Sequence, residues 1–395
     1  MTGRFPARYK IHGHFGTRGH NNKHKMPHWL DTKTTLVTRV LQQGGYRIGH
    51  FGKWHLGHVR GAPGPDQYGI DDTRILAGNG PGWDRMGKPT ETDVVHASYT
   101  TAAKEDRFWT HSTELIVDEA IAFMKANKDK PFYLNLWTIL PHAPNVPTAE
   151  QLAAYKDLKV NSADFGDWMK SYIDKSKDPQ KQMETYLAGM AEIDIALGRL
   201  LTAMDELKLT DNTFFFFTSD NGPEDYHIRN VAHSGLGSPG PFRGRKRSLY
   251  EGGIRMPCIA RWPDVIPAGK TDETSTLAAV DWLPTVCAIT GVANPEPNVD
   301  GESVLDILKG TPRERQKPLF WEWKTRVHGD RAYHCPQLAM IDGKWKLLQN
   351  YSSTRIELYD IEADPEERAN IAGKHADVVA RMSKQLLAWK AGLPK

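Results

Sequence analysis

Two apolar runs in the sequence each end in a pair of polar side chains that could take part in chemistry. Lys53 and His55 follow a run over residues 46–51, and Asp220 and Asn221 follow the run TFFFFT. In open α/β sheets, functional sites gather where the strands end in loops. We therefore expect the two pairs to lie at one edge of a sheet.

Two further loops carry candidate residues. His142 stands in the sequence LPHAP, where the prolines fix the backbone. Lys246 precedes a Gly-Gly turn in FRGRKRSLYEGG. Taken singly, such residues are more often loop histidines or solvated charges, and Asp220-Asn221-Gly222 is more often a turn. Their joint occurrence at the ends of successive strands favours a common site.

The residue types together describe a cradle for a tetrahedral anion. Asp and Asn side chains are hard oxygen ligands, which suit Ca²⁺ or Mg²⁺ better than zinc. Lysines are compact positive charges that can hold an anionic ester group. Histidines can donate or accept a proton near neutral pH. The expected site therefore combines a divalent cation, two lysines on the anion and imidazoles at the leaving group.

The segments around these residues alternate between helices and apolar strands. The expected helices begin at Asp31 or Thr32 and end near Gln43, and then span 112–127, 179–207 and 281–290; the expected strands lie at 46–51, 132–138, 213–218 and 256–261. This alternation predicts an α/β fold with a mostly parallel sheet sandwiched by helices.

After residue 316 the pattern changes to short strands joined by tight turns such as Asp342-Gly343, followed by a helix over 374–391. A change of this kind indicates a separate structural unit. We therefore expect a catalytic domain over 1–315 and a smaller C-terminal α+β subdomain, built on an antiparallel sheet, over 316–395.

The charge is distributed unevenly, although the formal net charge is only +3. Residues 1–60 contain eleven Lys and Arg, eight of the sixteen His and a single acidic residue, Asp31. A second basic cluster runs from Arg243 to Arg247. The asymmetry points to an anionic partner, although a solvated basic face is the ordinary explanation for single charges. We see no nucleic-acid-binding module, and a nucleic-acid partner is not expected.

The short apolar runs and the few cysteines argue against a membrane-spanning or a disulfide-rich protein. No apolar run approaches the length of a bilayer, so we expect no membrane span. The three cysteines, Cys258, Cys287 and Cys335, are too few and too scattered for a disulfide framework. We expect all three to be buried as small apolar side chains.

Longer stretches of the sequence resemble the type I sulfatases of the alkaline phosphatase-like superfamily. The segment GGYRIGHFGKWHLG is similar to the second signature of that family, and LPHAP, SDNGP and GRKRSLYEGGIRMP match it in order and spacing. TGRFP, DWLPTVCAITG, DGESVLDILKG and ELYDIEADPEERANIA extend the resemblance over essentially the whole chain. The resemblance implies an alkaline phosphatase-like fold, and some details are similar to bacterial N-acetylgalactosamine-6-sulfatases.

The resemblance also implies how a sulfate ester would be bound. Asp220 and Asn221 would bind one calcium ion, and Lys53 and Lys246 would contact the sulfate group. The family reaction is attack on sulfur by a hydrated formylglycine, loss of the alcohol and elimination of sulfate. His55 would then sit by the nucleophile and help its turnover.

The leaving group and the substrate are expected on the open side of this site. The resemblance places His142 near the leaving-group oxygen. Segments 60–110, with Trp83, and 222–242 follow the site strands and are expected to line the substrate mouth. The substrate would be a sulfated carbohydrate or an aryl ester, and family members are commonly periplasmic or extracellular.

The sequence departs from the family at the nucleophile. The family's Cys-x-Pro/Ala-x-Arg motif, which the formylglycine-generating enzyme modifies, would lie just upstream of Thr2-Gly3-Arg4, with an Asp-Asp pair of the metal site further upstream. The motif does not occur in residues 1–395, the position of that Asp-Asp pair lies before residue 1, and Cys258 in CIAR has its arginine one residue too early. We therefore expect an N-terminally truncated sulfatase with little or no turnover and an unpaired edge in its sheet.

Two alternatives stay open. A phosphatase, phosphodiesterase or phosphonate hydrolase of the same superfamily would bind two metal ions, for which His227 and His233 could be additional ligands. A degenerate member would only bind sulfated glycans, through the basic N-terminal segment and Arg243 to Arg247.

Overall fold

The strands that follow the first helices form a three-stranded parallel sheet. In the computed structural model, β1 (Arg47–Trp54) lies between β2 (Asp72–Ala77) and β3 (Phe132–Trp137), and pairs with both in parallel. The structure describes residues 1–57, 59, 61–77, 110–142, 145–224, 236–327 and 329–394. Parallel pairing confirms the α/β class predicted from the alternation of helices and strands.

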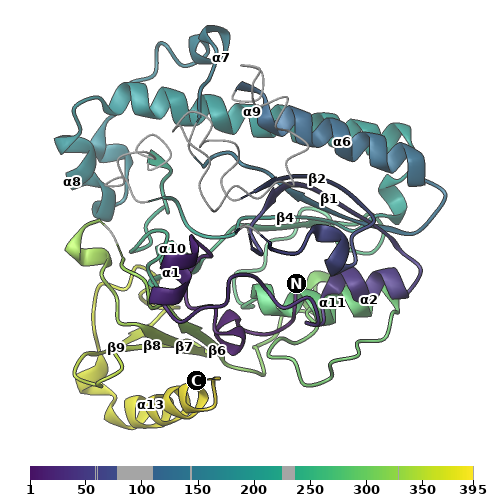
Figure 1. Ribbon diagram of the computed structural model, residues 1–395. Helices are drawn as coiled ribbons and strands as arrows, with labels where there is room; N and C mark the ends of the chain where they lie inside the picture. Colours follow the sequence, from purple (N-terminus) through teal and green to yellow (C-terminus); the bar gives the residue numbers. More distant parts are fainter. Residues whose placement is uncertain are drawn as a thin grey trace.

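Helices cover both faces of this sheet (Figure 1). α6 (Ser112–Asn127) and α9 (Pro179–Glu206) run side by side over one face, and α2 (Val37–Gln43) and α11 (Trp282–Thr290) lie on the other. The first pair buries an apolar stripe against β1 and β3, which includes Phe51, Ile116, Phe123, Ala196 and Leu200. Burying an apolar stripe on each face of the sheet is what holds these layers together.

The second site strand belongs to a separate pair. β4 (Phe215–Thr218) pairs with β5 (Cys258–Arg261) in antiparallel orientation. Within the described residues β3 and β4 each stand at the edge of a sheet, so the single continuous sheet that we expected is divided in two. Ile259 is 57% exposed and Cys258 is exposed. The expectation that all three cysteines are buried is therefore wrong for Cys258, which lies at the exposed start of β5; Cys287 is buried and Cys335 is half-buried.

The C-terminal part forms the predicted antiparallel sheet. Its strands pair in sequence order and are β6 (Leu319–Glu322), β7 (Leu338–Asp342), β8 (Trp345–Gln349) and β9 (Ile356–Asp360). Gly343 has a positive φ of 56° in the tight turn between β7 and β8, a conformation that glycine adopts without strain. α13 (Ala376–Ala391) packs on this sheet through Met382 and Leu386. The division at residue 315 stays a prediction.

Short elements connect these layers. The other helices in the described residues are α1 (Arg18–Lys23), α7 (Ala149–Ala153), α8 (Asp167–Lys175), α10 (Glu251–Ile254) and α12 (Leu305–Leu308). Single 3-10 turns lie at Pro6–Tyr9, Pro65–Tyr68, Ser162–Asp164, Thr210–Asn212, Ala279–Asp281, Arg331–Tyr333 and Ala372–Lys374. α1 and α10 lie between the parallel sheet and the C-terminal sheet (Figure 1). In the described parts of the chain, every helix is too short or too polar to cross a bilayer.

Two boundaries differ from the expected ones. The helix expected from Asp31 or Thr32 begins only at Val37, because the Asp31 carboxylate accepts the Lys33 N–H and closes a turn instead. β1 continues to Trp54, three residues beyond the expected end. Lys53 therefore lies inside the strand rather than after it.

Candidate functional site

The six predicted site residues line one cavity of about 2040 Å³: Lys53, His55, His142, Asp220, Asn221 and Lys246. The same cavity extends past β5 to the C-terminal sheet, so a place on its wall does not by itself put two side chains in contact. Charges and hydrogen bonds show which of the six lie close together.

Lys53 is the best-defined member of the group. Its ammonium group is largely buried at the end of β1, and this burial, together with the nearby charge of Lys246, lowers the pKa of Lys53 to about 8. Asp220 and Glu224 act in the opposite direction and support the charged form. Two lysines and two carboxylates therefore meet at one place, although they come from three separate segments of the chain.

Glu224 is a member of this group that the sequence reasoning missed. It is only 6% exposed, its Oε2 lies 3.3 Å from Nζ of Lys246, and it also pairs with the Arg247 guanidinium. The backbone N–H of Lys246 donates to the Pro223 carbonyl at 2.9 Å. Glu224 follows Asp220 by four positions in SDNGPE, so an acidic residue next to the motif was a visible signal.

The loop that carries Lys246 is fixed at its far end by α10. Glu251, at the start of α10, accepts a hydrogen bond at 2.8 Å from Lys346 of β8, which also lies 2.9 Å from Glu367. Lys346 is fully buried, so this cluster of charges holds α10 against the C-terminal sheet. The C-terminal sheet thus helps to position a site lysine.

Asp220 and Asn221 follow β4 as predicted. The Asn221 amide donates to the Gly222 carbonyl at 2.9 Å, and the Gly222 N–H donates to Gly253 at 3.0 Å, which joins this loop to α10. Calcium takes six to eight oxygen ligands. The carboxylate and amide oxygens of the pair suit that ion, but the described residues contain no group of three or more His, Cys, Asp or Glu placed to hold a metal. The two residues can supply part of a calcium site.

The two histidines approach the cavity from different elements. His55 follows β1, and its Nε2 lies 3.0 Å from the Phe15 carbonyl oxygen. A carbonyl can only accept, so Nε2 carries the hydrogen and Nδ1 is the basic atom of the neutral ring. The backbone N–H of His142 donates to the Ile139 carbonyl at 2.9 Å. His14, which sequence reasoning did not single out, also lines the cavity beside His55.

The basic cluster from Arg243 to Arg247 is not the surface that we predicted. Arg245 is 1% exposed and donates to the carbonyls of Glu224 and Gly237. The Arg243 guanidinium lies 3.9 Å from the ring centre of Tyr250 and donates to the Ala332 carbonyl. These arginines bind backbone and aromatic rings of their own chain, so the prediction of an exposed glycan-binding patch here is wrong for them.

Part of the predicted substrate mouth lies outside the described residues. This holds for Trp83, for most of segment 60–110, and for His227 and His233. The two histidines were the additional ligands of the two-metal alternative, which stays untested.

Comparison with known proteins matches both parts of the chain. The family model described as "Sulfatase" matches residues 1–292, and the model described as "N-sulphoglucosamine sulphohydrolase, C-terminal" matches residues 242–392. The N-acetylgalactosamine-6-O-sulfatase of Bacteroides thetaiotaomicron is 27% identical over 91% of the chain and 78% of its own length. The N-acetylgalactosamine-6-sulfatase of Canis lupus familiaris is 28% identical over 81% of the chain, which spans 57% of that relative's length.

The fold is shared with solved structures. A crystal structure of Ps i-CgsB in complex with k-i-k-neocarrahexaose superposes with a TM-score of 0.72 at 23% sequence identity. The match covers 98% of the chain described here and 80% of the Ps i-CgsB chain. At this identity the likeness concerns the fold alone.

Proposed function

Because the chain belongs to the sulfatase family, we propose that its cavity binds sulfate esters of carbohydrates and takes part in their hydrolysis. The observation that carries the proposal is the meeting of Lys53, Lys246 and Asp220 at one end of the cavity. Two neighbouring, partly buried ammonium groups can neutralise the charge of a sulfate ester where screening by water is reduced. The relatives named as N-acetylgalactosamine 6-sulfatases support a sulfated sugar as the substrate class.

Each site residue then has a role. Lys53 and Lys246 hold the non-bridging oxygens of the sulfate group. His142 donates a proton to the leaving-group oxygen, and His55, with Nδ1 as its basic atom, accepts one beside the attacking group. A calcium ion, held in part by Asp220 and Asn221, would supply positive charge to the sulfate oxygens, and a formylglycine would supply the attacking oxygen.

The nucleophile is not among residues 1–395. No Cys or Ser in them stands in a Cys-x-Pro/Ala-x-Arg motif or its Ser variant. We therefore propose that these residues alone bind a sulfate ester and release little or no sulfate from it. Modification by the formylglycine-generating enzyme and a periplasmic or extracellular location belong to the same proposal, and the family resemblance is their support.

The experiment measures the affinity of residues 1–395 for N-acetylgalactosamine 6-sulfate by calorimetry, with calcium present. We expect Lys53→Met and Lys246→Met each to weaken binding by about tenfold or more, since each removes a charge-assisted hydrogen bond. Lys156→Met, an exposed lysine remote from the cavity, is the matched control and should bind as the parent chain does. Unchanged affinity in both site variants would remove the proposed site. Sustained sulfate release by residues 1–395 would refute the proposed lack of turnover.

A further inference from the structure

A row of imidazole rings runs from the cavity to the outer surface. The ring centres of His55 and His14 are 6.4 Å apart, those of His14 and His20 are 4.8 Å apart, and those of His20 and His24 are 4.7 Å apart. His55 and His14 line the cavity, and His20 and His24 belong to α1 and its C-terminal end. A continuous track of polar rings therefore connects the candidate sulfate site to α1.

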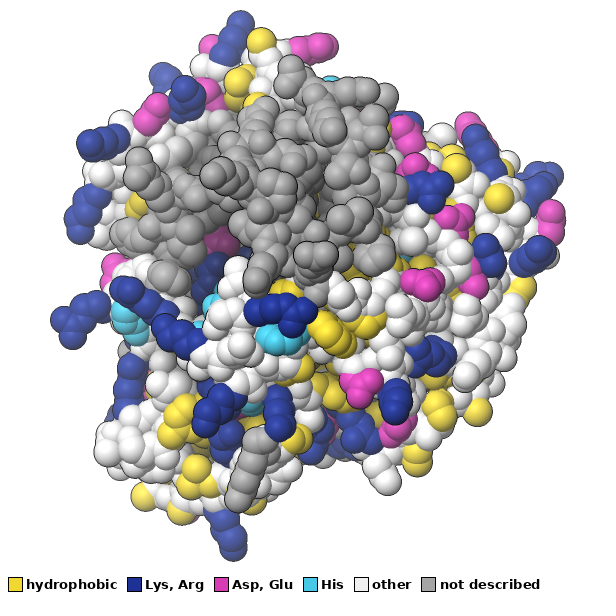
Figure 2. Space-filling model, in the orientation of Figure 1, with side chains coloured by type: hydrophobic (Ala, Val, Ile, Leu, Met, Phe, Trp, Pro, Cys, Tyr) yellow, Lys and Arg dark blue, Asp and Glu magenta, His cyan; other side chains and the backbone are white. Residues whose placement is uncertain are grey.

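Unneutralised cations surround the outer end of this row. Lys23 and Lys25 are exposed, and no ion pair of either is formed within the described ranges. Burial lowers the pKa of Lys324, and the charges of Lys390 and Lys25 add to this effect, although Lys324 lies 3.7 Å from Glu322. Lys23 and His24 likewise act with burial to lower the pKa of His20. Figure 2 shows Lys, Arg and His side chains gathered on the face that carries α1.

Other cations of the same N-terminal segment are arranged differently. Arg4 lies 2.6 Å from Glu296, and Arg8 lies 2.6 Å from Asp300. The segment therefore pairs Arg4 and Arg8 where it packs against the rest of the protein, whereas Lys23 and Lys25 form no ion pair with the described residues. Like charges held together without counter-charges cost free energy, and an anionic ligand would remove that cost.

We propose that His14, His20, His24, Lys23 and Lys25 form a second anion subsite, which binds a further sulfate or carboxylate group of a polymeric sulfated glycan while one sulfate ester occupies the Lys53 and Lys246 site. The inference rests on the proposed function, because the row of rings begins at that site. It makes the substrate a polymer with several anionic groups rather than a single sulfated sugar.

The chemistry of this face fits a sulfated glycan better than a nucleic acid or a metal ion. Single-stranded nucleic acids are bound on exposed aromatic rings, but Phe15, the aromatic residue nearest to α1 in sequence, is 4% exposed. A metal ion needs ligand atoms that converge, and the described residues offer no group of three His, Cys, Asp or Glu that does so. Exposed ammonium groups beside imidazoles give this face a positive potential, which attracts a polymer that carries many anionic groups.

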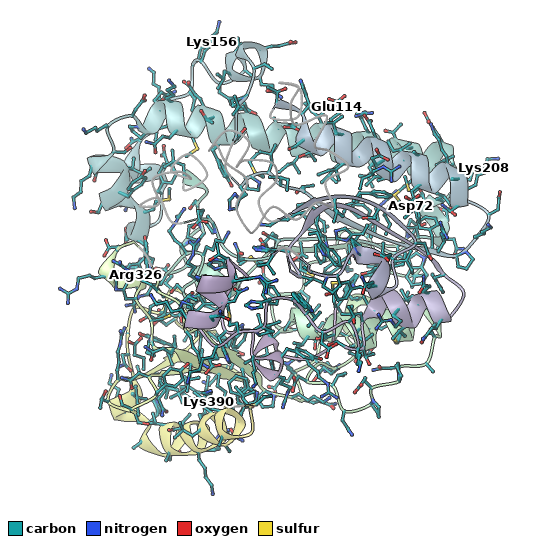
Figure 3. The ribbon with its side chains drawn as sticks, in the orientation of Figure 1. Asp72, Glu114, Lys156, Lys208, Arg326 and Lys390 are labelled. Atoms are coloured by element: carbon teal, nitrogen blue, oxygen red, sulfur yellow. The ribbon has the colours of Figure 1, made fainter. Side chains whose placement is uncertain are left out.

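The experiment compares a polymer with a monosaccharide on matched variants. The variant Lys23→Gln/Lys25→Gln is compared with the control Lys156→Gln/Lys159→Gln. The control removes the same charge from an exposed segment. Lys156 projects at the opposite end of the molecule from Lys390 and α13 (Figure 3). We expect the first variant to bind chondroitin sulfate about tenfold more weakly, with a shallower salt dependence, and to bind N-acetylgalactosamine 6-sulfate unchanged. The control should bind both as the parent chain does.

A second variant and a second ligand keep the result decisive. His20→Gln/His24→Gln should also weaken binding of chondroitin sulfate alone, with an unchanged melting temperature as the check on folding. If the α1 variants and the control bound chondroitin sulfate equally tightly, the subsite would be overturned. It would also be overturned if an oligonucleotide of equal charge bound the parent chain as tightly as chondroitin sulfate does. Lys53→Met tests the proposed function separately. If this variant binds N-acetylgalactosamine 6-sulfate as tightly as the parent chain does, the Lys53 and Lys246 site is refuted. The affinity of the α1 variants for chondroitin sulfate then still tests the second subsite.

Discussion

Glu224 places a negative charge beside a site that is proposed to bind an anion. Its carboxylate pairs with Lys246 and Arg247, and its charge also reaches Lys53. A carboxylate and a bound sulfate that share the same lysines repel each other, and this repulsion should outweigh a small shift of Lys246. We expect Glu224→Gln to bind inorganic sulfate about two- to tenfold more tightly, measured by calorimetry. Weaker binding would mean that Glu224 acts mainly by holding Lys246 in place.

For individual residues, the sequence predicted candidate members of the site but not all of their partners. Lys53, Asp220 and Lys246 were expected together from their motifs, and the charges of Asp220 and Lys246 both act on Lys53; their roles in a common site stay predictions. His14 was missed because an imidazole in a loop has no spacing that distinguishes it, whereas Glu224 was missed although it stands four positions after Asp220. The burial of Arg245 was equally invisible, since its carbonyl acceptors come from distant loops.

The loop after β4 crosses α10 so closely that only glycine fits. A Cβ on Gly222 would lie 1.9 Å from the Gly252 carbonyl oxygen, and the nearest atoms all belong to the backbone of Gly252 and Gly253, so there is no flexible side chain to move. We expect Gly222→Ala to destabilise the protein by about 2–3 kcal/mol and to weaken sulfate binding, measured by urea unfolding and calorimetry.

Gly198→Ala supplies the contrasting change within an ordinary helix. Gly198 is exposed on α9 and has open space around its Cβ position. Alanine there should stabilise the protein by about 0.5–1 kcal/mol and leave sulfate binding unchanged. If both alanine variants behaved alike, the close crossing would not be what constrains Gly222.

Elements with a strong periodic pattern were predicted well, and the ends of elements were not. α6 has the expected bounds and α9 ends one residue early, because their apolar stripes are long enough to fix a period. The start of α2 was misplaced because a side chain competes with the helix for backbone N–H groups. The division between β3 and β4 concerns which strands pair, and pairing is set by contacts that a local pattern does not contain.

Three distant segments of the molecule converge on the buried carboxylate of Glu322 in β6. His12 Nδ1 lies 2.5 Å from one oxygen, and the Lys390 ammonium and the Tyr351 hydroxyl each lie 2.8 Å from the other. Glu322 thereby links β6 to the N-terminal segment, to the loop that follows β8, and to α13. Since the N-terminal segment also carries His14 and α1, Glu322 connects the C-terminal sheet to both proposed anion sites.

Glu322 should also determine how the whole molecule responds to acid. Burial alone would raise its pKa, but the hydrogen bonds from His12, Lys390 and Tyr351 lower it to about 2. A carboxyl whose pKa falls on folding contributes stability above its ordinary value near 4.5, and that stability is lost as the pH falls towards 2. We expect Glu322→Gln to lower the free energy of unfolding by about 3 kcal/mol at pH 7 and to flatten its decline between pH 5 and pH 2, measured by urea unfolding across that range. Glu119→Gln, in a half-exposed pair with Arg74, should change stability by less than about 0.5 kcal/mol. If both variants kept the acid profile of the parent chain, the link through Glu322 would not stabilise the assembled molecule.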